Sequence, residues 1–259
     1  MTNILHEIIA NKKEEVAALK ARLPLEALQA RTDLHRPRRP FFELFENSGV
    51  LIGEIKPKSP SHGALTSDPL SVAKKYAPTM INCISVLTDI KYFGGSLELL
   101  EQVHALAPQT ILRKEFVVDV YQIYETALTS ADAVLLIASV LDEAELKACI
   151  AACTACNLGY FVEVHTEPEV EKALRCGARI IGINNRNLDT LTIDLSVTEQ
   201  LIATIPHSIP VISESGIQNA ADVSRVRAAG ARGILVGASI LQSADPAEHI
   251  ASLQAALVV

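Results

Sequence analysis

Six polar residues stand within or directly after short apolar runs of the sequence, where most core strands carry none. They are Glu54, Lys56, Lys114, Glu163, Asn184 and Glu214. Two lysines among three carboxylates provide proton donors, proton acceptors and charges that can stabilise a developing oxyanion. The alternative is a buried salt-bridge cluster that only orders the fold, but ion pairs withdrawn from water stabilise little. The group therefore indicates an acid–base active site, whereas for Glu214 alone a role in orienting a lysine stays equally open.

These residues belong to eight short, β-rich runs, and an amphipathic helical stretch follows nearly every run. Continuously apolar strands separated by helices are typical of a parallel sheet with a covered outer face, and eight such units close a barrel. The runs are Val50–Lys56, Cys83–Asp89, Thr110–Phe116, Ala133–Ser139, Gly159–His165, Ile180–Asn185, Pro210–Ser215 and Gly233–Ser239. A doubly wound open sheet is the alternative, but the sequence has neither a glycine-rich dinucleotide motif after the first run nor a Walker-type lysine loop. The sequence therefore predicts an α/β fold, a (β/α)8 TIM barrel.

Alternation along the strands decides where the polar side chains point. Glu54 and Lys56 share one face of their strand while Ile55 takes the other, and Glu163 is likewise separated from its two neighbours. Their face must be the barrel interior, because a charge on the opposite face would be buried under the helices. The first, third, fifth and seventh strands have the same parity, and alternate strands supply common interior layers. We therefore expect the lysines and carboxylates to meet at one mouth of the barrel.

Glycines after the seventh and eighth runs suggest an anion site. Ser215–Gly216 follows the seventh run, and Gly237–Ala238 starts the helical stretch of the eighth. Barrels commonly bind phosphate at these two positions through backbone N–H groups. A single glycine after a strand is more often a simple turn, so the prediction depends on the two positions together. The loop of residues 57–63 adds Ser59 and cations that could cover a phosphate, whereas we interpret His62 as a solvated loop residue.

Residues 1–48 precede the first strand, and we interpret the whole chain, 1–259, as one domain with an N-terminal helical extension. The sequence predicts two helices there, ILHEIIANKKEEVAALKAR and LPLEALQAR, before a basic stretch broken by prolines (His35–Pro40). A disordered arm is the alternative, but the apolar positions recur at helical spacing, which favours packing on the barrel. Further along, Asp68–Pro69 is typical of a helix start and Gly177 of a helix end.

Charge and composition argue against several classes of protein. A net charge of −7 and a pI near 5.5 disfavour a nucleic-acid-binding protein. The N-terminus mixes acids and bases and no stretch approaches a membrane span, so we expect no export signal, no membrane contact and a cytoplasmic location. Cys149, Cys153 and Cys156 have the spacing of one helix face. A metal site is the alternative there, but buried cysteines are common small hydrophobes, so we predict no metal.

Motifs around the polar residues resemble those of the indole-3-glycerol-phosphate synthase family. The matching segments occur in family order along essentially the whole chain, and the helical extension is also a family feature. They are EIKPKSPS (54–61), SVLTD (85–89), FGGS (93–96), LRK (112–114), GINNRNL (182–188) and ISESG (212–216). The resemblance implies a lyase of tryptophan biosynthesis. Its reaction converts 1-(2-carboxyphenylamino)-1-deoxyribulose 5-phosphate to indole-3-glycerol phosphate, with loss of carbon dioxide and water and without a cofactor.

The resemblance also implies roles for the charged residues. Lys114 would be the acid that protonates the ketone oxygen during ring closure, and Glu163 would be the base of the dehydration. Lys56, positioned by Glu54, would pair with the substrate carboxylate. Which of Lys56, Glu54 or Lys114 supplies the second proton stays open, because the groups of such a cluster titrate together.

The substrate-binding residues follow from the same resemblance. Asn184 and Glu214 would bind substrate hydroxyls and hold the lysines, and Arg186 would fix the loop geometry. The phosphate site would comprise Ser59, Ser215, Gly216, Gly237 and Ala238, and an apolar slot for the aryl ring would comprise Phe93, Leu112, Phe116, Leu135 and Leu188. The expected partner is this small phosphorylated substrate. We expect a monomer, and association with other enzymes of the pathway stays open.

Two positions depart from the family pattern. Glu115 replaces the usual aspartate, but alternation points it away from Lys114, so we expect little effect on the chemistry. Ala238 replaces serine or glutamate, which keeps a backbone N–H contact to phosphate and loses any side-chain contact.

Two rival functions remain to be weighed. A barrel of the phosphoribosylanthranilate isomerase kind works with a cysteine and an aspartate, and no cysteine stands at the end of the first run here. A non-catalytic paralogue that serves as a binding module would be expected to lack Lys114 or Glu163, and both are present.

Overall fold

A closed barrel of parallel strands forms the centre of the protein. In a computed structural model, which describes residues 4–46, 49–60, 63–66, 68–187 and 190–258, the strands pair in the circular order β1, β10, β9, β8, β7, β6, β5, β4. Their bounds are β1 (Val50–Ile55), β4 (Cys83–Leu87), β5 (Thr110–Lys114), β6 (Ala133–Ile137), β7 (Gly159–Val164), β8 (Ile181–Asn184), β9 (Val211–Glu214) and β10 (Gly233–Val236). The predicted (β/α)8 fold is confirmed, and each predicted run extends one to three residues past the end of its strand.

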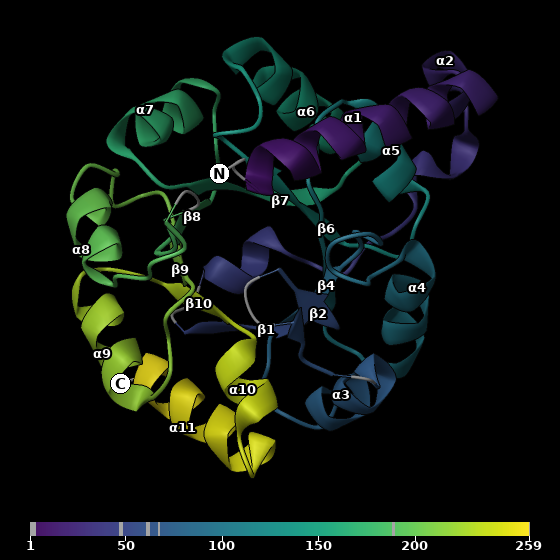
Figure 1. The fold of residues 1–259 in the computed structure, drawn as a ribbon. Helices are drawn as coiled ribbons and strands as arrows, with labels where there is room; N and C mark the ends of the chain where they lie inside the picture. Colours follow the sequence, from purple (N-terminus) through teal and green to yellow (C-terminus); the bar gives the residue numbers. More distant parts are fainter. Residues whose placement is uncertain (1–3, 47–48, 61–62, 67, 188–189, 259) are drawn as a thin grey trace.

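Helices surround this barrel, as Figure 1 shows. They are α3 (Pro69–Tyr76), α4 (Leu97–Leu106), α5 (Tyr121–Ala127), α6 (Glu143–Ala155), α7 (Glu167–Arg175), α8 (Ser196–Ile202), α9 (Ala220–Ala228), α10 (Ala238–Gln242) and α11 (Pro246–Val258). The Asp68 carboxylate caps α3 by accepting the Ser71 N–H at 3.0 Å. Gly177 follows α7 with a φ of 82°, a left-handed conformation that glycine adopts at little cost. Both predicted helix boundaries are therefore confirmed. Among the described residues, none of the helices is both long and apolar enough to cross a membrane.

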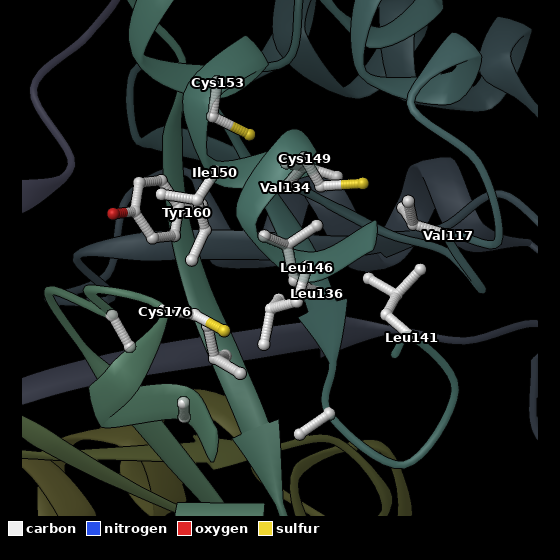
Figure 2. Packing of buried hydrophobic residues seen from close by; sticks show 14 of the residues in the cluster. Val117, Val134, Leu136, Leu141, Leu146, Cys149, Ile150, Cys153, Tyr160 and Cys176 are labelled. Carbon is white, nitrogen blue, oxygen red and sulfur yellow. The ribbon is translucent and has the colours of Figure 1, made fainter. Parts of the chain in front are cut away.

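The space between strands and helices is filled by apolar side chains. Figure 2 shows part of this layer, where Cys149 and Cys153 of α6 lie beside Val134 and Leu136 of β6. The five cysteines of the chain are buried free thiols. Burial raises the pKa of the Cys149 thiol to about 12. The cysteines on this helix face thus pack as small hydrophobes.

The N-terminal extension packs on the barrel. It comprises α1 (Ile4–Arg22), α2 (Leu25–Gln29) and two short 3₁₀ helices, η1 (Thr32–His35) and η2 (Phe42–Phe45). Both α1, the long purple helix of Figure 1, and α2 contact α5. Val16 of α1 and Leu28 of α2 are buried in one cluster with Tyr121 of α5. The two predicted helices and their packing are confirmed, so the extension is not a disordered arm.

The basic stretch after α2 ties the extension to the amino end of the barrel. Arg38 donates to the carbonyl of Ala127 at the end of α5 (2.9 Å) and to that of Ala131 in the connection from α5 to β6 (2.6 Å). Phe41 then enters the barrel interior, where a Cβ on Gly159, the first residue of β7, would lie 2.6 Å from Phe41 Cβ. Phe45 is buried in the same cluster. Because the extension closes the amino end, the carboxyl ends of the strands remain as the open mouth.

Candidate active site

A cavity of about 570 Å³ opens at the carboxyl ends of the strands. The six polar residues singled out from the sequence line it, namely Glu54, Lys56, Lys114, Glu163, Asn184 and Glu214. Four barrel strands, β1, β5, β7 and β9, alternate around the barrel and supply the charged members. The parity of the strands therefore brings two lysines and three carboxylates together at one mouth, and we call these five residues the cavity cluster.

Lys114 lies at the centre of the cavity cluster. Its Nζ is 2.5 Å from Glu214 Oε2 and 3.2 Å from Glu163 Oε2, and it lies 5.9 Å from the centroid of the Phe161 ring beneath it. Burial alone would lower the pKa of Lys114, but the Glu214, Glu163 and Glu54 carboxylates outweigh it and hold this pKa well above its usual value. Lys114 is therefore a charged proton donor at neutral pH.

The two carboxylates that share Lys114 have different pKa values. Burial raises the pKa of Glu214 to about 7, because Lys114 offsets only part of the desolvation and Glu163 adds repulsion. Burial also acts on Glu163, but Lys114, His165 and a hydrogen bond from Asn184 hold its pKa below the usual value. When the pKa values of two buried acids differ in this way, one tends to be protonated and the other ionised. Glu163 is thus ionised and fit to act as a base.

Glu54 and Lys56 form the other half of the cavity cluster. Lys56 Nζ pairs with Glu54 Oε2. Burial would raise the pKa of Glu54, but Lys56 and Lys114 lower it below the usual value. A Cβ on Gly237 would lie 2.8 Å from Glu54 Oε2, so glycine leaves room for this carboxylate. The Lys56 side chain is 21% exposed and can reach a ligand in the cavity.

Two asparagines order the ends of β8 and β9. Asn184 accepts the Arg186 N–H at 3.1 Å, and Arg186 Nη1 donates to the Leu191 carbonyl at 3.2 Å. These contacts support the loop-fixing role expected for Arg186, which also lines the cavity. Asn185 is buried and donates to the Glu214 carbonyl at 2.9 Å. Sequence reasoning missed Asn185, although a second polar residue at the end of the same run was a usable signal.

Four of the five predicted phosphate residues line the cavity. Ser215, Gly216, Gly237 and Ala238 line it, and α10 begins there at Ala238. Ser215 and Gly216 have φ values of 66° and 89°, in the left-handed region. A side chain at Gly216 would also collide with Ile193, 2.7 Å from the Cβ position. A non-glycine residue held in this region is a strained feature of the kind that clusters at functional sites.

Two residues expected to bind substrate, Ser59 and Leu112, do not line the cavity. Ser59 is buried in a small hairpin of β2 (Lys58–Ser59) and β3 (Gly63–Ala64) and does not line the cavity. Leu112 is fully buried deeper in the barrel with Phe161 and does not line it either. Leu188 lies outside the described residues, as does His62.

The remaining predicted apolar residues form one wall. Phe93 and Phe116 line the cavity with ring centroids 5.7 Å apart and planes inclined at 37°. Leu135 lies on the same wall, as does Ile137, which sequence reasoning missed. An apolar wall facing a charged cluster suits a ligand that combines an aryl ring with acidic groups.

Comparison with known proteins agrees with this geometry. Residues 5–253 match the family model described as indole-3-glycerol phosphate synthase. The chain belongs to this family. It is 40% identical over 260 residues to the indole-3-glycerol phosphate synthase of Albidiferax ferrireducens, with 98% of each chain covered. It is 39% identical to the one of Acetivibrio thermocellus, covering 97% of this chain and 99% of the relative.

Solved structures show the same barrel in more distant proteins. The crystal structure of 3-hexulose-6-phosphate synthase from Salmonella typhimurium has a TM-score of 0.66 and 16% identity, covering 81% of this chain and 98% of that one. At this identity the likeness concerns the fold alone. The family resemblance seen in the motifs of the sequence is confirmed by the match to indole-3-glycerol phosphate synthases.

Other cavity residues of this indole-3-glycerol phosphate synthase family member were not foreseen. Leu5 reaches the cavity from α1, far along the chain from every strand. His249 of α11 also lines the cavity, with Nε2 3.3 Å from Ser239 Oγ. Neither residue stands in a motif, so nothing in the local sequence distinguishes them. Over the part of the chain that is described, no three His, Cys, Asp or Glu side chains are grouped so as to hold a metal ion.

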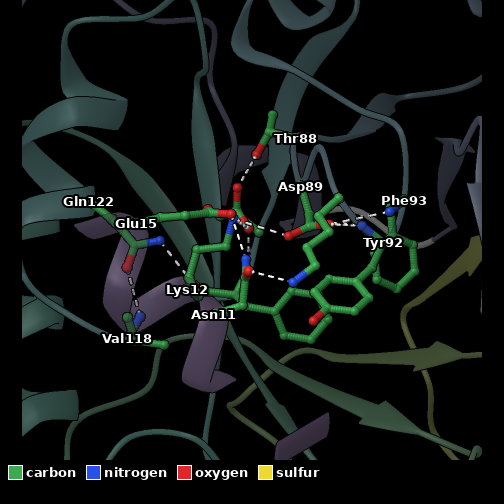
Figure 3. Close-up of polar contacts among 12 residues, drawn as sticks. Asn11, Lys12, Glu15, Thr88, Asp89, Tyr92, Phe93, Val118 and Gln122 are labelled. Atoms are coloured by element: carbon green, nitrogen blue, oxygen red, sulfur yellow. Dashed lines mark hydrogen bonds and ion pairs between the residues drawn. The ribbon is translucent and has the colours of Figure 1, made fainter. Parts of the chain in front are cut away.

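A second ionic cluster lies behind the cavity of this synthase-family barrel, under α1. Figure 3 shows Lys12 between Glu15 and Asp89. Lys12 Nζ is 3.1 Å from Asp89 Oδ2 and 3.2 Å from Glu115 Oε1, and Glu115 also accepts the Thr88 hydroxyl at 2.8 Å. We call Lys12, Asp89, Arg113 and Glu115 the Lys12 cluster. Glu115 and Lys114, neighbours in the chain, thus have separate partners, in the manner that alternation predicts.

Proposed function

We propose that this protein converts 1-(2-carboxyphenylamino)-1-deoxyribulose 5-phosphate to indole-3-glycerol phosphate, carbon dioxide and water, without a cofactor. The observation that carries the proposal is the cavity cluster, in which a charged lysine lies between a carboxylate of lowered pKa and one of raised pKa. Membership of the indole-3-glycerol phosphate synthase family supports the same reaction. Ring closure followed by dehydration needs both an acid and a base, and this cluster contains both.

The first step in this proposal is closure of the five-membered ring. The aryl ring would lie against Phe93, Phe116 and Leu135, with its carboxylate paired to Lys56. The ring carbon that bears this carboxylate attacks the ketone carbon, while Lys114 protonates the ketone oxygen. The carboxylate partners of Lys114 raise the pKa of this lysine. When a substrate oxygen replaces one of them, the pKa of Lys114 falls, and this favours transfer of its proton to the substrate.

Loss of carbon dioxide restores the aromatic ring and leaves a hydroxyl group on the new five-membered ring. Dehydration then removes that hydroxyl as water, with a proton from an acid, and takes a proton from the neighbouring CH₂ group. Glu163 is the proposed base, since it is ionised and lines the cavity. The acid of this step is one of Lys56, Glu54 and Lys114. Asn184 and Glu214 are proposed to bind substrate hydroxyls.

The phosphate end of the substrate is assigned to the other side of the cavity. Backbone N–H groups at Ser215, Gly216, Gly237 and Ala238 are the proposed donors, because these residues line the cavity at the loops after β9 and β10. Ser59 is not among the lining residues and would need to move to reach this phosphate. The proposal further takes the enzyme to be a monomer in the cytoplasm, which gel filtration and fractionation of cells would test.

Indole fluorescence provides the direct test. The chain contains no tryptophan, so the protein background is low. We expect a rise in fluorescence on mixing the metal-free protein with the substrate, and a rise about 100-fold slower or more with the Lys114→Ala variant. No rise from a protein whose circular dichroism shows an intact fold would contradict the proposal and favour a non-catalytic binding role.

The cysteine positions disfavour the isomerase alternative. Cys83 is the first residue of β4 and is fully buried at the amino end of the barrel. Neither Cys83 nor the other four cysteines line the cavity. The cysteine that such an isomerase needs at the mouth of the barrel is therefore not among the residues that line this cavity.

A further inference from the structure

His165 lies immediately behind Glu163, the proposed base. It follows Val164 at the end of β7, so alternation places His165 on the same side of the strand as Glu163. Its side chain is 11% exposed and does not line the cavity. His165 can therefore act on a bound substrate only through another residue.

The imidazole of His165 lies between two carboxylates. Nδ1 is 3.3 Å from Glu169 Oε2, and the His165 backbone N–H donates to the same oxygen at 2.7 Å. Nε2 is 3.4 Å from Glu163 Oε1 and is buried without a hydrogen bond in the described part of the chain. A neutral imidazole has one N–H, whereas an imidazolium has two and can direct one at each carboxylate. The arrangement favours the imidazolium.

The charges around His165 also favour its imidazolium form. Burial would lower the pKa of His165, but Glu169 of α7, Glu163 of β7 and Glu214 of β9 raise it above the usual value. The cation facing this group of carboxylates from β5 is Lys114, and Asn184 of β8 supplies a neutral hydrogen bond to Glu163.

Glu163 shares the Lys114 ammonium group with Glu214, so a second cation is needed to keep Glu163 ionised. Lys114 Nζ is closer to Glu214 (2.5 Å) than to Glu163 (3.2 Å). Within the described residues, Glu214 pairs with Lys114 and makes no ion pair with a histidine, and its Oε1 has no hydrogen-bond partner. The pKa of Glu214 rises to about 7. The pKa of Glu163 falls instead, in an equally buried position. His165 is the second cation that pairs with Glu163, and the Asn184 hydrogen bond acts on the pKa of Glu163 in the same direction.

We propose that His165 is a positioning residue that, held as an imidazolium by Glu169, keeps Glu163 ionised and orients its carboxylate toward the cavity. This inference rests on the proposed role of Glu163 as the base of the reaction. Substitution of His165 removes a positive neighbour of Glu163, so the pKa of Glu163 rises. Because the base must be ionised, the acid limb of the activity profile then moves to higher pH.

The charge state of His165 can be measured without any turnover. An NMR titration of the imidazole Cε1–H signals would assign His165 as the signal that His165→Gln lacks. We expect a midpoint above the usual value of about 6.5, and a midpoint about one unit lower in Glu169→Gln and in Glu163→Gln. A midpoint at or below about 6.5 in the parent protein overturns the inference, whatever the activity of the enzyme.

The pH dependence of kcat separates positioning from a merely structural role. We expect His165→Gln to move the acid limb up by about one pH unit, which lowers kcat by up to about tenfold at pH values on that limb, while kcat near neutrality and KM stay within about twofold of the parent. Glu169→Gln should give a smaller shift of the same sign and provides the test if His165→Gln does not fold. His207→Gln, at an exposed histidine, is the matched control and should change nothing.

Two outcomes would count against the inference in different ways. A loss of kcat by the same factor at every pH, with an unmoved acid limb, would reduce His165 to a structural role. Full turnover by Glu163→Gln would instead remove Glu163 as the base and with it the proposed mechanism, while the NMR titration would still report whether His165 is an imidazolium.

Discussion

Two clusters of buried charge lie side by side in this barrel, and the neighbouring residues Lys114 and Glu115 belong to different clusters. In the cavity cluster Lys114 lies 2.5 Å from Glu214 and 3.2 Å from Glu163. In the Lys12 cluster Lys12 lies 3.1 Å from Asp89 and 3.2 Å from Glu115. Each lysine thus lies between two buried carboxylates at similar distances. The clusters differ in their surroundings, because Lys12 also pairs with the partly exposed Glu15 at 2.7 Å and Arg113 pairs with Glu115 at 3.6 Å.

Access distinguishes them. The Lys114 side chain is 14% exposed and lines the cavity, whereas the Lys12 side chain is 6% exposed and does not line it. Of the Lys12 partners given above, Glu115 lines the cavity and Asp89 does not. A ligand in the cavity can therefore contact Lys114 directly, whereas it can act on Lys12 only through Glu115. The same arrangement supports proton transfer in the first cluster and ties α1 to β4 and β5 in the second. We expect substitutions in the first to act on turnover and those in the second to act on stability.

Lys114→Ala should have the largest effect on turnover. Loss of the general acid is expected to lower kcat by about 100-fold or more. The fold and the binding of a reduced substrate analogue should be retained, because Glu214, with a pKa of about 7 even beside Lys114, can take up a proton and neutralise the site. Steady-state kinetics and analogue titration would check this. Lys147→Ala, at an exposed lysine paired with Glu143, is the control, and a near-normal kcat for Lys114→Ala would remove Lys114 from its role.

Lys12→Met should have the largest effect on stability. Removing one partner of a buried ion pair leaves an uncompensated charge, here chiefly on Asp89 because Arg113 stays 3.6 Å from Glu115, at a cost of about 3 to 5 kcal/mol in the free energy of unfolding. The loss of kcat should be much smaller than that of Lys114→Ala. Denaturant unfolding would measure the difference, with Lys20→Met as the control. Lys20 is 37% exposed and pairs with Asp119, so its loss should cost less than about 1 kcal/mol. Equal stability losses in the two variants would contradict the distinction.

Glu214→Gln should remove a pH dependence of stability. The folded-state pKa of Glu214 is raised to about 7 from its ordinary value of 4.5, so the folded state binds the extra proton between these values. The stability that this group contributes is fully present below about pH 4.5 and is lost as the pH rises through about 7, by up to about 3 kcal/mol. Relative to the parent protein, Glu214→Gln should therefore gain stability as the pH rises through this window. Parallel stability curves between pH 4.5 and 7 would show that Glu214 is already ionised.

The sequence predicted the cavity cluster because two strong regularities coincide there. Continuous apolar runs locate the eight strands, and period-two alternation tells which side of each strand faces inward. Alternation does not give depth along the barrel axis. Leu112 and Lys114 have the same parity, yet Leu112 lies one layer deeper and misses the cavity. Ile137 has the same parity as Leu135 and lies two residues closer to the open mouth, so it also reaches the cavity.

The Lys12 cluster could not be predicted from the local sequence. Lys12 stands in the run NKKEE of an otherwise ordinary amphipathic helix, where a lysine usually faces water. Its burial depends on how α1 packs on the barrel, where Val16 of α1 is buried in one cluster with Tyr121 of α5. His165 was missed for a related reason, because its partner Glu169 meets it only once the turn into α7 has formed.

Glu115→Asp should have the smallest effect and tests the boundary between the two clusters. The carboxylate of Glu115 contacts Lys12, Thr88 and its own following N–H at Phe116, and none of these contacts belongs to the cavity cluster. Aspartate keeps the charge but shortens the reach by one CH₂ group, so the 3.2 Å contact with Lys12 should weaken and stability should fall by about 1 kcal/mol. Turnover should stay within about twofold, because Lys114 keeps both of its carboxylate partners. Kinetics and denaturant unfolding on the same preparation would check both expectations. A tenfold change in kcat with unchanged stability would mean that the charges of the two clusters are coupled through the strand end of β5, and that access alone does not separate them.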